Sequence, residues 1–189
     1  MKKVVAIILS LAMLLSCAAC FAEAAEAAEV AEVAEKEELG TVNVNGVFKI
    51  QGRIPEGYRL SFLNQNPMYI RCKLISESKE KPGVELTIAY AEDWADTERL
   101  NDVSEADLLE IEESFREEDE VNIEYRTTAY GTKVMVVTEA LEETDFVAVY
   151  TIYKGYELEF VMTPGSNPLT EENTQMLVDF ISEMDFVEA

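Results

Sequence analysis

The stretch FVAVYTIYKGYELEFVM, residues 146–162, decides the fold. Its first eight residues are almost all apolar, which is typical of a strand buried on both faces of a sheet. Lys154-Gly155 then makes a tight turn. After the turn, apolar residues alternate with Glu157 and Glu159, so that one face of the second strand is apolar and the other carries carboxylates. The stretch therefore predicts two adjacent strands in the middle of an antiparallel sheet.

Alternating apolar positions predict further strands on both sides of this stretch, because period two marks a half-buried strand. Pro67 and Pro82-Gly83 mark turns between these strands. Gly131-Thr132 suits a hairpin turn before the apolar residues 134–137. The alternating positions are Val42, Val44, Phe48 and Ile50; Tyr58, Leu60 and Phe62; Met68, Ile70, Cys72 and Leu74; Val84, Leu86, Ile88 and Tyr90; and Ile123, Tyr125, Thr127 and Ala129.

Two segments have helical spacing instead. Ser104 and Asp107 resemble a capping box and predict a helix from about 105 to 117, and Thr170 suits the N-cap of a second helix. Their apolar stripes are Leu108, Ile111 and Phe115, and Met176, Leu177, Phe180, Ile181 and Met184. The order of elements predicts one α+β domain over residues 41–189: a twisted, mainly antiparallel sheet with a helix packed on each face.

Residues 1–22 are predicted to be a secretion signal, because two lysines are followed by an apolar run and then by small residues. The run is too short to cross a bilayer, and no later stretch predicts a transmembrane helix in the mature chain. Cleavage after Ala22 or Ala24 would release the protein outside the cytoplasm. In the alternative, residues 14–17 act as a lipobox, and lipid on Cys17 anchors the chain to the membrane.

The strongly acidic composition limits the kinds of partner. Residues 23–40 are rich in Ala and Glu and predict a solvated spacer. The whole chain has a net charge of −23, and loss of the signal, which holds two lysines and no acids, makes it more negative. Nucleic acids and anionic membrane surfaces are therefore excluded as partners, because both attract clustered Lys and Arg.

The inventory of reactive side chains argues against an enzyme. The chain has no histidine, which excludes Ser-His-Asp and Cys-His catalysis and His-based zinc sites. Cys72 shares its strand face with apolar residues, so a buried structural thiol is expected. A carboxylate pair could hydrolyse glycosides, but among 38 acids some pair always lies at a suitable distance. No phosphate-binding glycine motif or dedicated calcium loop is present, and we expect no cofactor or metal.

The register of the strands around residues 58–74 predicts a basic cluster. Pairing Leu60 with Ile70 would set Arg59 opposite Arg71, with Lys73 nearby on the same face. Opposed like charges need neutralisation, which we expect from the acid-rich segment 92–124. An ion-pair network inside the chain is one interpretation of the cluster. The other is an open patch formed by Arg59, Arg71 and Lys73 that binds an anionic ligand or acidic partner.

The chain resembles the superfamily named after PsbP, the extrinsic protein of photosystem II. The resemblance covers residues 47–187 and rests on the element order, on Ile54-Pro55-Glu56-Gly57-Tyr58 after Phe48, and on Tyr130-Gly131-Thr132-Lys133 before an apolar strand. It implies a similar α+β fold and a protein that binds partners or assists assembly without catalysis. No catalytic or binding residues are implied for this chain.

Three hypotheses of function follow from the sequence. The preferred one is a non-catalytic, exported module that binds an unknown protein, peptide or small ligand in a bacterial cell envelope or exterior. The second is an accessory lipoprotein anchored through Cys17. The third is a carboxylate-dependent hydrolase, which would need raised carboxylate pKa values in a polar cleft.

Overall fold

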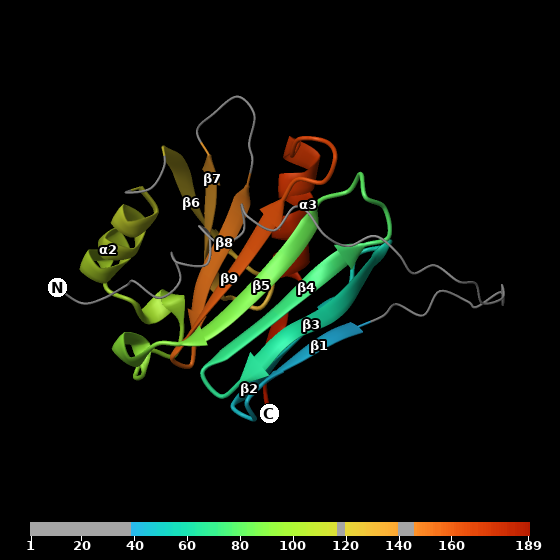
Figure 1. Ribbon diagram of the computed structural model, residues 1–189. Coiled ribbons are helices and arrows are strands. Elements are labelled where there is room, and N and C mark those ends of the chain that lie inside the picture. Colours follow the sequence, from blue (N-terminus) through green and yellow to red (C-terminus); the bar gives the residue numbers. More distant parts are fainter. Residues whose placement is uncertain (1–38, 117–119, 140–145) are drawn as a thin grey trace. The chain divides into compact units, whose positions relative to one another are not determined.

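The computed structural model describes residues 39–116, 120–139 and 146–189. The predicted signal (1–22) and all but the last two residues of the predicted spacer (23–40) lie outside these ranges. Within the described ranges, the chain forms two β-sheets and two α-helices (Figure 1). The predicted α+β class is therefore confirmed.

The larger sheet has seven antiparallel strands in the order β3-β4-β5-β9-β8-β7-β6. Its central strand is β9, so the stretch 146–162 does form the middle of the sheet. Lys154 and Gly155 both have positive φ, as a two-residue hairpin turn requires. The strands are β3 (Tyr58–Asn66), β4 (Tyr69–Ser76), β5 (Gly83–Tyr90), β6 (Val121–Thr127), β7 (Lys133–Glu139), β8 (Val147–Tyr153) and β9 (Tyr156–Thr163).

A second, three-stranded sheet has the order β1-β2-β10. Its strands are β1 (Leu39–Val44), β2 (Phe48–Arg53) and β10 (Asp185–Glu188). The alternation of residues 42–50 predicts β1 and β2, but a single sheet was expected. The separate sheet arises because β2 pairs with the C-terminal strand β10, from the far end of the chain, and not with β3.

The helices begin and end close to the predicted positions. Helix α2 spans Glu105–Arg116 and α3 spans Glu171–Ser182, where Thr170 forms the predicted N-cap by accepting a hydrogen bond from the Asn173 N–H. Two short 3₁₀ helices, η1 (Glu92–Trp94) and η2 (Leu100–Asp102), precede α2.

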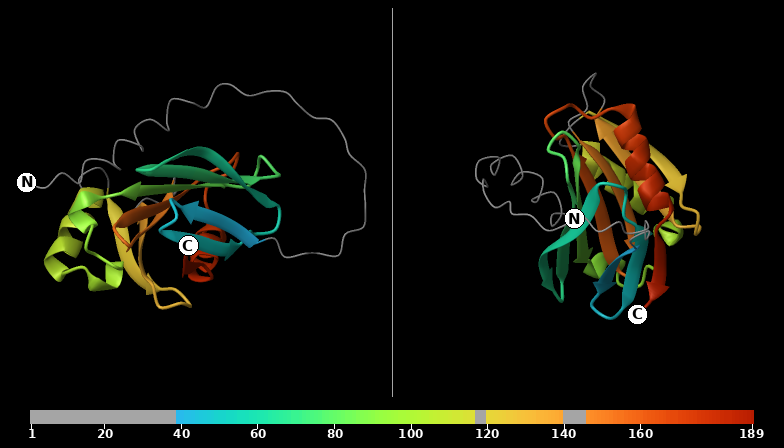
Figure 2. Two further views of the ribbon diagram at one scale, coloured as in Figure 1. Left: turned by 90° about the horizontal axis from the view of Figure 1, so that it is seen from below. Right: turned by 90° about the vertical axis from the view of Figure 1, so that its right-hand side faces the viewer.

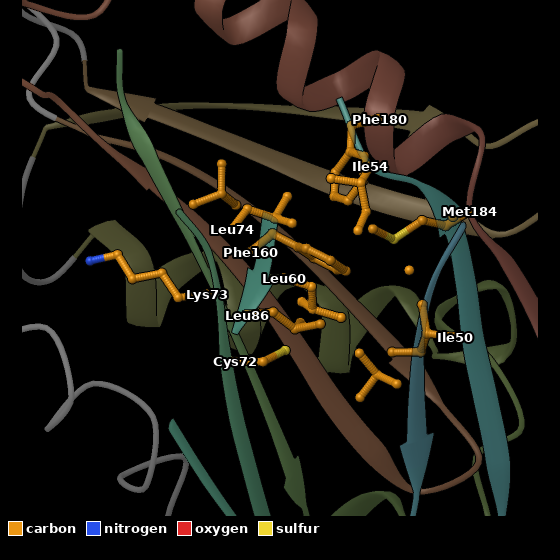
Figure 3. Close-up of a pocket in the computed structure, with 14 residues that line it drawn as sticks. Ile50, Ile54, Leu60, Cys72, Lys73, Leu74, Leu86, Phe160, Phe180 and Met184 are labelled. Atoms are coloured by element: carbon orange, nitrogen blue, oxygen red, sulfur yellow. The ribbon is translucent and has the colours of Figure 1, made fainter. Parts of the chain in front are cut away.

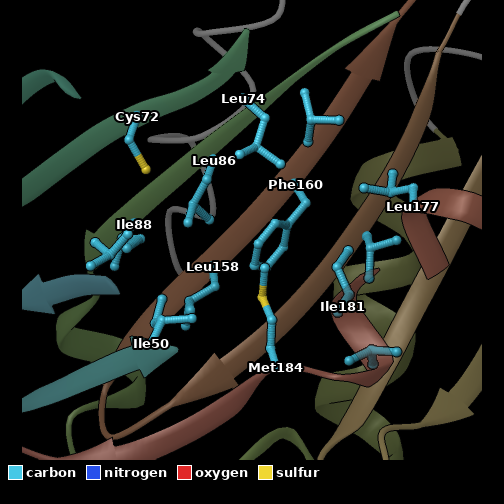
Figure 4. Packing of buried hydrophobic residues seen from close by; sticks show 14 of the residues in the cluster. Ile50, Cys72, Leu74, Leu86, Ile88, Leu158, Phe160, Leu177, Ile181 and Met184 are labelled. Carbon is cyan, nitrogen blue, oxygen red and sulfur yellow. The ribbon is translucent and has the colours of Figure 1, made fainter. Parts of the chain in front are cut away.

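The main core lies between one face of the larger sheet and a layer made of α3 and the smaller sheet (Figures 2 and 4). Phe160 of β9, Leu177 and Ile181 of α3, and Phe48 of β2 are all buried in it. Phe48 also makes an edge contact with the ring of Tyr153, with ring centroids 4.9 Å apart. The apolar face of the central hairpin is thus covered by segments that lie before and after it in the sequence.

The opposite face of the larger sheet is in contact with α2 at one end. The ring of Phe115 lies 6.0 Å from the ring of Tyr150 in β8. Tyr150 alternates along β8 with Val149, which belongs to the main core, so its side chain lies on the other face. Leu108 and Ile111 of α2 are buried, as their predicted stripe requires.

We expect Ile181→Ala to lower the free energy of unfolding by about 3 kcal/mol, because it leaves a cavity in the main core. Leu109→Ala is the control, since Leu109 is 56% exposed on α2 and its loss changes little. Urea unfolding followed by circular dichroism measures both variants. Equal, small effects would show that α3 does not hold the core together.

Candidate functional site

The predicted pairing of Leu60 with Ile70 is wrong. Leu60 faces Leu74, and Ile70 faces Gln65. Two features shift the register: the hairpin turn lies at Pro67 and Met68 in place of Gln65, and a bulge between Phe62 and Asn64 absorbs one residue. Asn66 Oδ1 accepts the N–H of Met68 at 3.0 Å and fixes the turn.

The shifted register separates the predicted basic cluster. Arg59 faces Ile75, and the predicted opposition of Arg59 and Arg71 does not occur. Arg71 instead forms an ion pair with Glu85 of β5, and Lys73 is the cross-strand neighbour of the same Glu85. One neutralising acid therefore comes from the adjacent strand; residues 117–119 of segment 92–124 lie outside the described ranges, and the expectation that this segment neutralises the cluster stays a prediction. At Arg71, the arrangement matches the interpretation of an ion pair inside the chain.

A row of directly opposed residues crosses the same face of the larger sheet. Glu159 of β9 lies at its centre, between Thr87 of β5 and Tyr150 of β8. The complete row is Asn64, Arg71, Thr87, Glu159, Tyr150, Met135 and Tyr125. Six strand pairings must be known before these residues can be aligned, and no single stretch of sequence contains that information.

Glu157 lies two residues from Glu159 on the same face and accepts two hydrogen bonds. Trp94 Nε1 and the Tyr150 hydroxyl each donate to Glu157 Oε1 at 2.9 Å. Burial raises the pKa of Glu157, and these two hydrogen bonds oppose the shift. Burial also raises the pKa of Tyr150 well above its ordinary value, and the charge of Glu157 adds to that shift. Tyr150 is therefore a hydrogen-bond donor at every physiological pH.

Glu159 differs from Glu157 in its hydrogen bonding. Its side chain is 3% exposed, and in the described ranges no hydrogen bond or ion pair to it is present. Burial raises its pKa to about 7, with smaller contributions from Glu157 and Glu85. A carboxyl with this pKa is partly protonated near neutral pH and can donate a proton. This raised carboxylate pKa is one of the two features that the hydrolase hypothesis needs.

Cys72 is buried, as predicted from its strand face. Burial raises the pKa of its thiol to about 12, with a further contribution from the charge of Glu85. At neutral pH the thiol is therefore protonated, and it is a poor nucleophile. Cys72 has the role of a small apolar core residue.

Cys72 also lines an apolar cavity between the two sheets (Figure 3). The cavity measures about 30 Å³ and is lined by side chains such as Ile50, Leu86, Phe160 and Met184. Pockets that bind small molecules usually measure hundreds of Å³. This space has the size of one or two water molecules, so it is a gap in core packing and not a ligand site.

Two further properties concern the described residues alone. In that part of the chain, no group of three or more Asp, Glu, Cys or His side chains is arranged to hold a metal ion. In the same ranges, no helix has the length and apolar character needed to span a membrane.

Four large apolar side chains are exposed on two hairpins that touch each other. Val47 is 42%, Phe62 50%, Leu63 51% and Met68 55% exposed. Val47 belongs to the β1–β2 turn, and the other three belong to β3 and the turn that follows it. We call these four residues the hairpin patch. Most of the other large apolar residues in the described ranges are partly or fully buried.

Two hydrogen bonds join the turns that carry the hairpin patch. Asn45 Nδ2 donates to the carbonyl oxygen of Pro67 at 2.8 Å, and Gln65 Nε2 donates to the carbonyl oxygen of Asn43 at 3.4 Å. The patch was not predicted, because alternation places Phe62 and Met68 on a buried strand face. One signal was present: the segment 60–70 has no charged residue, although 28% of the chain is charged.

Comparison with solved structures found a similar protein. The chain is similar in structure to cyanobacterial PsbP (CyanoP) from Synechocystis sp. PCC 6803, whose solution structure matches 84% of this chain and 97% of that chain, with 13% identity and a TM-score of 0.48. The resemblance to PsbP predicted from the sequence is thus confirmed as a weak likeness of fold. No protein-family model and no curated protein sequence matches the chain.

We expect Glu159→Gln to stabilise the protein more at pH 8 than at pH 5. The folded chain keeps the proton of Glu159 until the pH reaches its raised pKa of about 7, whereas the unfolded chain loses it near 4.5. The wild type therefore loses stability as the pH rises through this window, and glutamine, which cannot ionise, does not. The gain at pH 8 should be on the order of 1–3 kcal/mol.

Urea unfolding at the two pH values measures the effect. The control is Glu113→Gln, because Glu113 is exposed on α2. A gain for Glu159→Gln that is the same at pH 5 and pH 8 would show that Glu159 is ionised throughout in the folded protein.

Proposed function

We propose that this chain is a non-catalytic, exported binding module of a bacterial cell envelope or exterior. The hairpin patch is the observation that carries the proposal. Single exposed apolar residues are common on protein surfaces, but a group of them on adjoining segments marks an interaction site. Val47, Phe62, Leu63 and Met68 form such a group, at two turns that are hydrogen-bonded to each other.

A binding role fits the side chains better than hydrolysis does. Glu157 and Glu159 are the carboxylates with raised pKa values, but both are buried, and Glu157 is already held by Trp94 and Tyr150. A general acid must reach the atom that it protonates, within hydrogen-bond distance. The buried position of this pair therefore argues against the carboxylate-dependent hydrolase.

The partner that we propose is a protein or peptide, because an apolar patch gains most from burying another apolar surface. The charge of −23 argues against nucleic acid. We propose that the protein acts outside the cytoplasm after residues 1–22 are removed. The alternative, an accessory lipoprotein anchored through Cys17, uses the same patch from a fixed position at the membrane.

Export gives the first test of this proposal. We expect the mature protein to begin within residues 23–28, because small residues precede these positions at the end of the signal. Intact-mass measurement of protein purified from the native host determines the N-terminus. A diacylglyceryl mass on Cys17 would establish the lipoprotein alternative, and an uncleaved chain would contradict export.

Photo-cross-linking in the native host tests the binding role. A benzophenone amino acid at Val47 is expected to cross-link one major polypeptide, because Val47 lies in the hairpin patch. The same amino acid at Leu109, which is more exposed than Val47 and lies on α2, is the control and should give no such product. Identical products from both positions, or none from Val47, would contradict the patch as a binding surface.

A further inference from the structure

We propose that β3 is a docking edge, to which an uncharged, extended segment of a partner protein adds as an eighth strand of the larger sheet. The proposal rests on the binding function proposed above and states how the partner is held. It combines three observations: the position of β3 in the sheet, the side chains along it, and the distribution of charge.

The position of β3 leaves one side of the strand available. It is the terminal strand of the larger sheet, and in the described ranges its only strand neighbour is β4. No backbone hydrogen bond joins residues 60–66 to any described segment other than β4. The outer N–H and C=O groups of an edge strand are a template for pairing with another chain, and many peptide-binding domains use such an edge.

The side chains of β3 do not protect this edge. Natural edge strands are usually guarded by charged residues, especially lysine. Residues 60–70 contain none, and Phe62 and Leu63 are both half exposed on the edge strand itself. The bulge between Phe62 and Asn64 and the nearby Pro67 limit the pairing to a short length.

The other edge of the same sheet shows the contrast. Strand β6 carries Glu124 and Arg126, which form an ion pair with each other. The hydroxyl of Tyr125 donates a hydrogen bond to Glu112 of α2 at 2.8 Å, so a helix lies beside this edge. The two edges therefore differ in the features that prevent strand addition: β6 has charges along its middle and a helix beside it, whereas β3 has one charge, Arg59 near its start, and none over residues 60–66.

The distribution of charge indicates what kind of partner segment binds to the β3 edge. A basic peptide would be drawn to the acids that cover the rest of the chain, and it would gain nothing from the uncharged segment 60–70. A second copy would bring another charge of −23 close to the first. An uncharged apolar strand avoids both problems, since backbone hydrogen bonds hold it and its side chains cover Phe62 and Leu63.

Amide hydrogen exchange with a peptide probe tests the proposal. The probe is a blocked peptide of about seven alternating threonine and valine residues, close to the usual length of a strand. We expect saturating peptide to slow exchange of the amides of residues 60–66 by about tenfold or more, because pairing buries the outer N–H groups of β3. The control peptide has proline at its central position, which removes a donor, and should give no protection.

Matched variants locate the contact. Leu63→Lys places a charge on the docking edge and is expected to abolish the protection. Leu109→Lys changes a leucine of similar exposure on α2 and should leave the protection unchanged. Both side chains are exposed, so both variants are expected to fold, and circular dichroism checks this.

Three exchange results would overturn the proposal: protection of β6 in place of β3, equal protection by the proline peptide, or no protection at a saturating concentration of the probe. A wild-type dimer that Leu63→Lys dissociates would also overturn it, because the occupant of the edge would then be a second copy of the chain. A cross-link from Val47 without protection of β3 would keep the binding function and reject strand pairing. If Val47 gives no cross-link and the probe gives no protection of β3, the binding function is rejected as well.

Discussion

The fold depends on the burial of the β8–β9 hairpin from both sides. Every residue of β8 is buried, and so is β9 up to its last position. A sheet whose central strands are buried on both faces is stable only when a layer covers each face. On one face, α3 and the smaller sheet form that layer, and on the other face η2 and α2 approach the strands from β8 to β6.

The same burial explains the unusual state of the acids on β9. Alternation places Glu157 and Glu159 on the face opposite the main core, and their neighbours Tyr150 and Trp94 come from other parts of the chain. An acid with hydrogen-bond donors is held in place, whereas one without them responds to burial by keeping its proton. Glu157 and Glu159 show these two responses two residues apart: two hydrogen bonds oppose the rise in the pKa of Glu157, whereas burial raises the pKa of Glu159 to about 7.

Local patterns predicted most of the elements but not how the strands pair. The central hairpin, helix α2, the N-cap at Thr170 and the burial of Cys72 follow from residues that are close together in the sequence. The pairing of Leu60 with Ile70 was wrong because a bulge and a proline turn change the register, and alternation carries no information about either. The smaller sheet was missed because its third strand, β10, comes from the far end of the chain and is only four residues long.

The candidate site was predicted less well than the fold, again because its prediction depended on how two strands pair. The basic cluster was built on one assumed register, so a shift of four residues moved Arg59 away from Arg71 and left Glu85 as the partner of Arg71.

The hairpin patch was missed because alternation was taken to mean burial. An apolar residue on an edge strand has the same spacing as one in the centre, but it has a neighbouring strand on one side alone. What separates the two cases in the sequence is charge. Strand β6 and the surface of α2 carry ionised side chains, which hold water and oppose pairing with another strand, and residues 60–70 carry none. In a chain with a net charge of −23, an uncharged edge costs solubility, and the proposed partner strand would offset this cost by covering the edge.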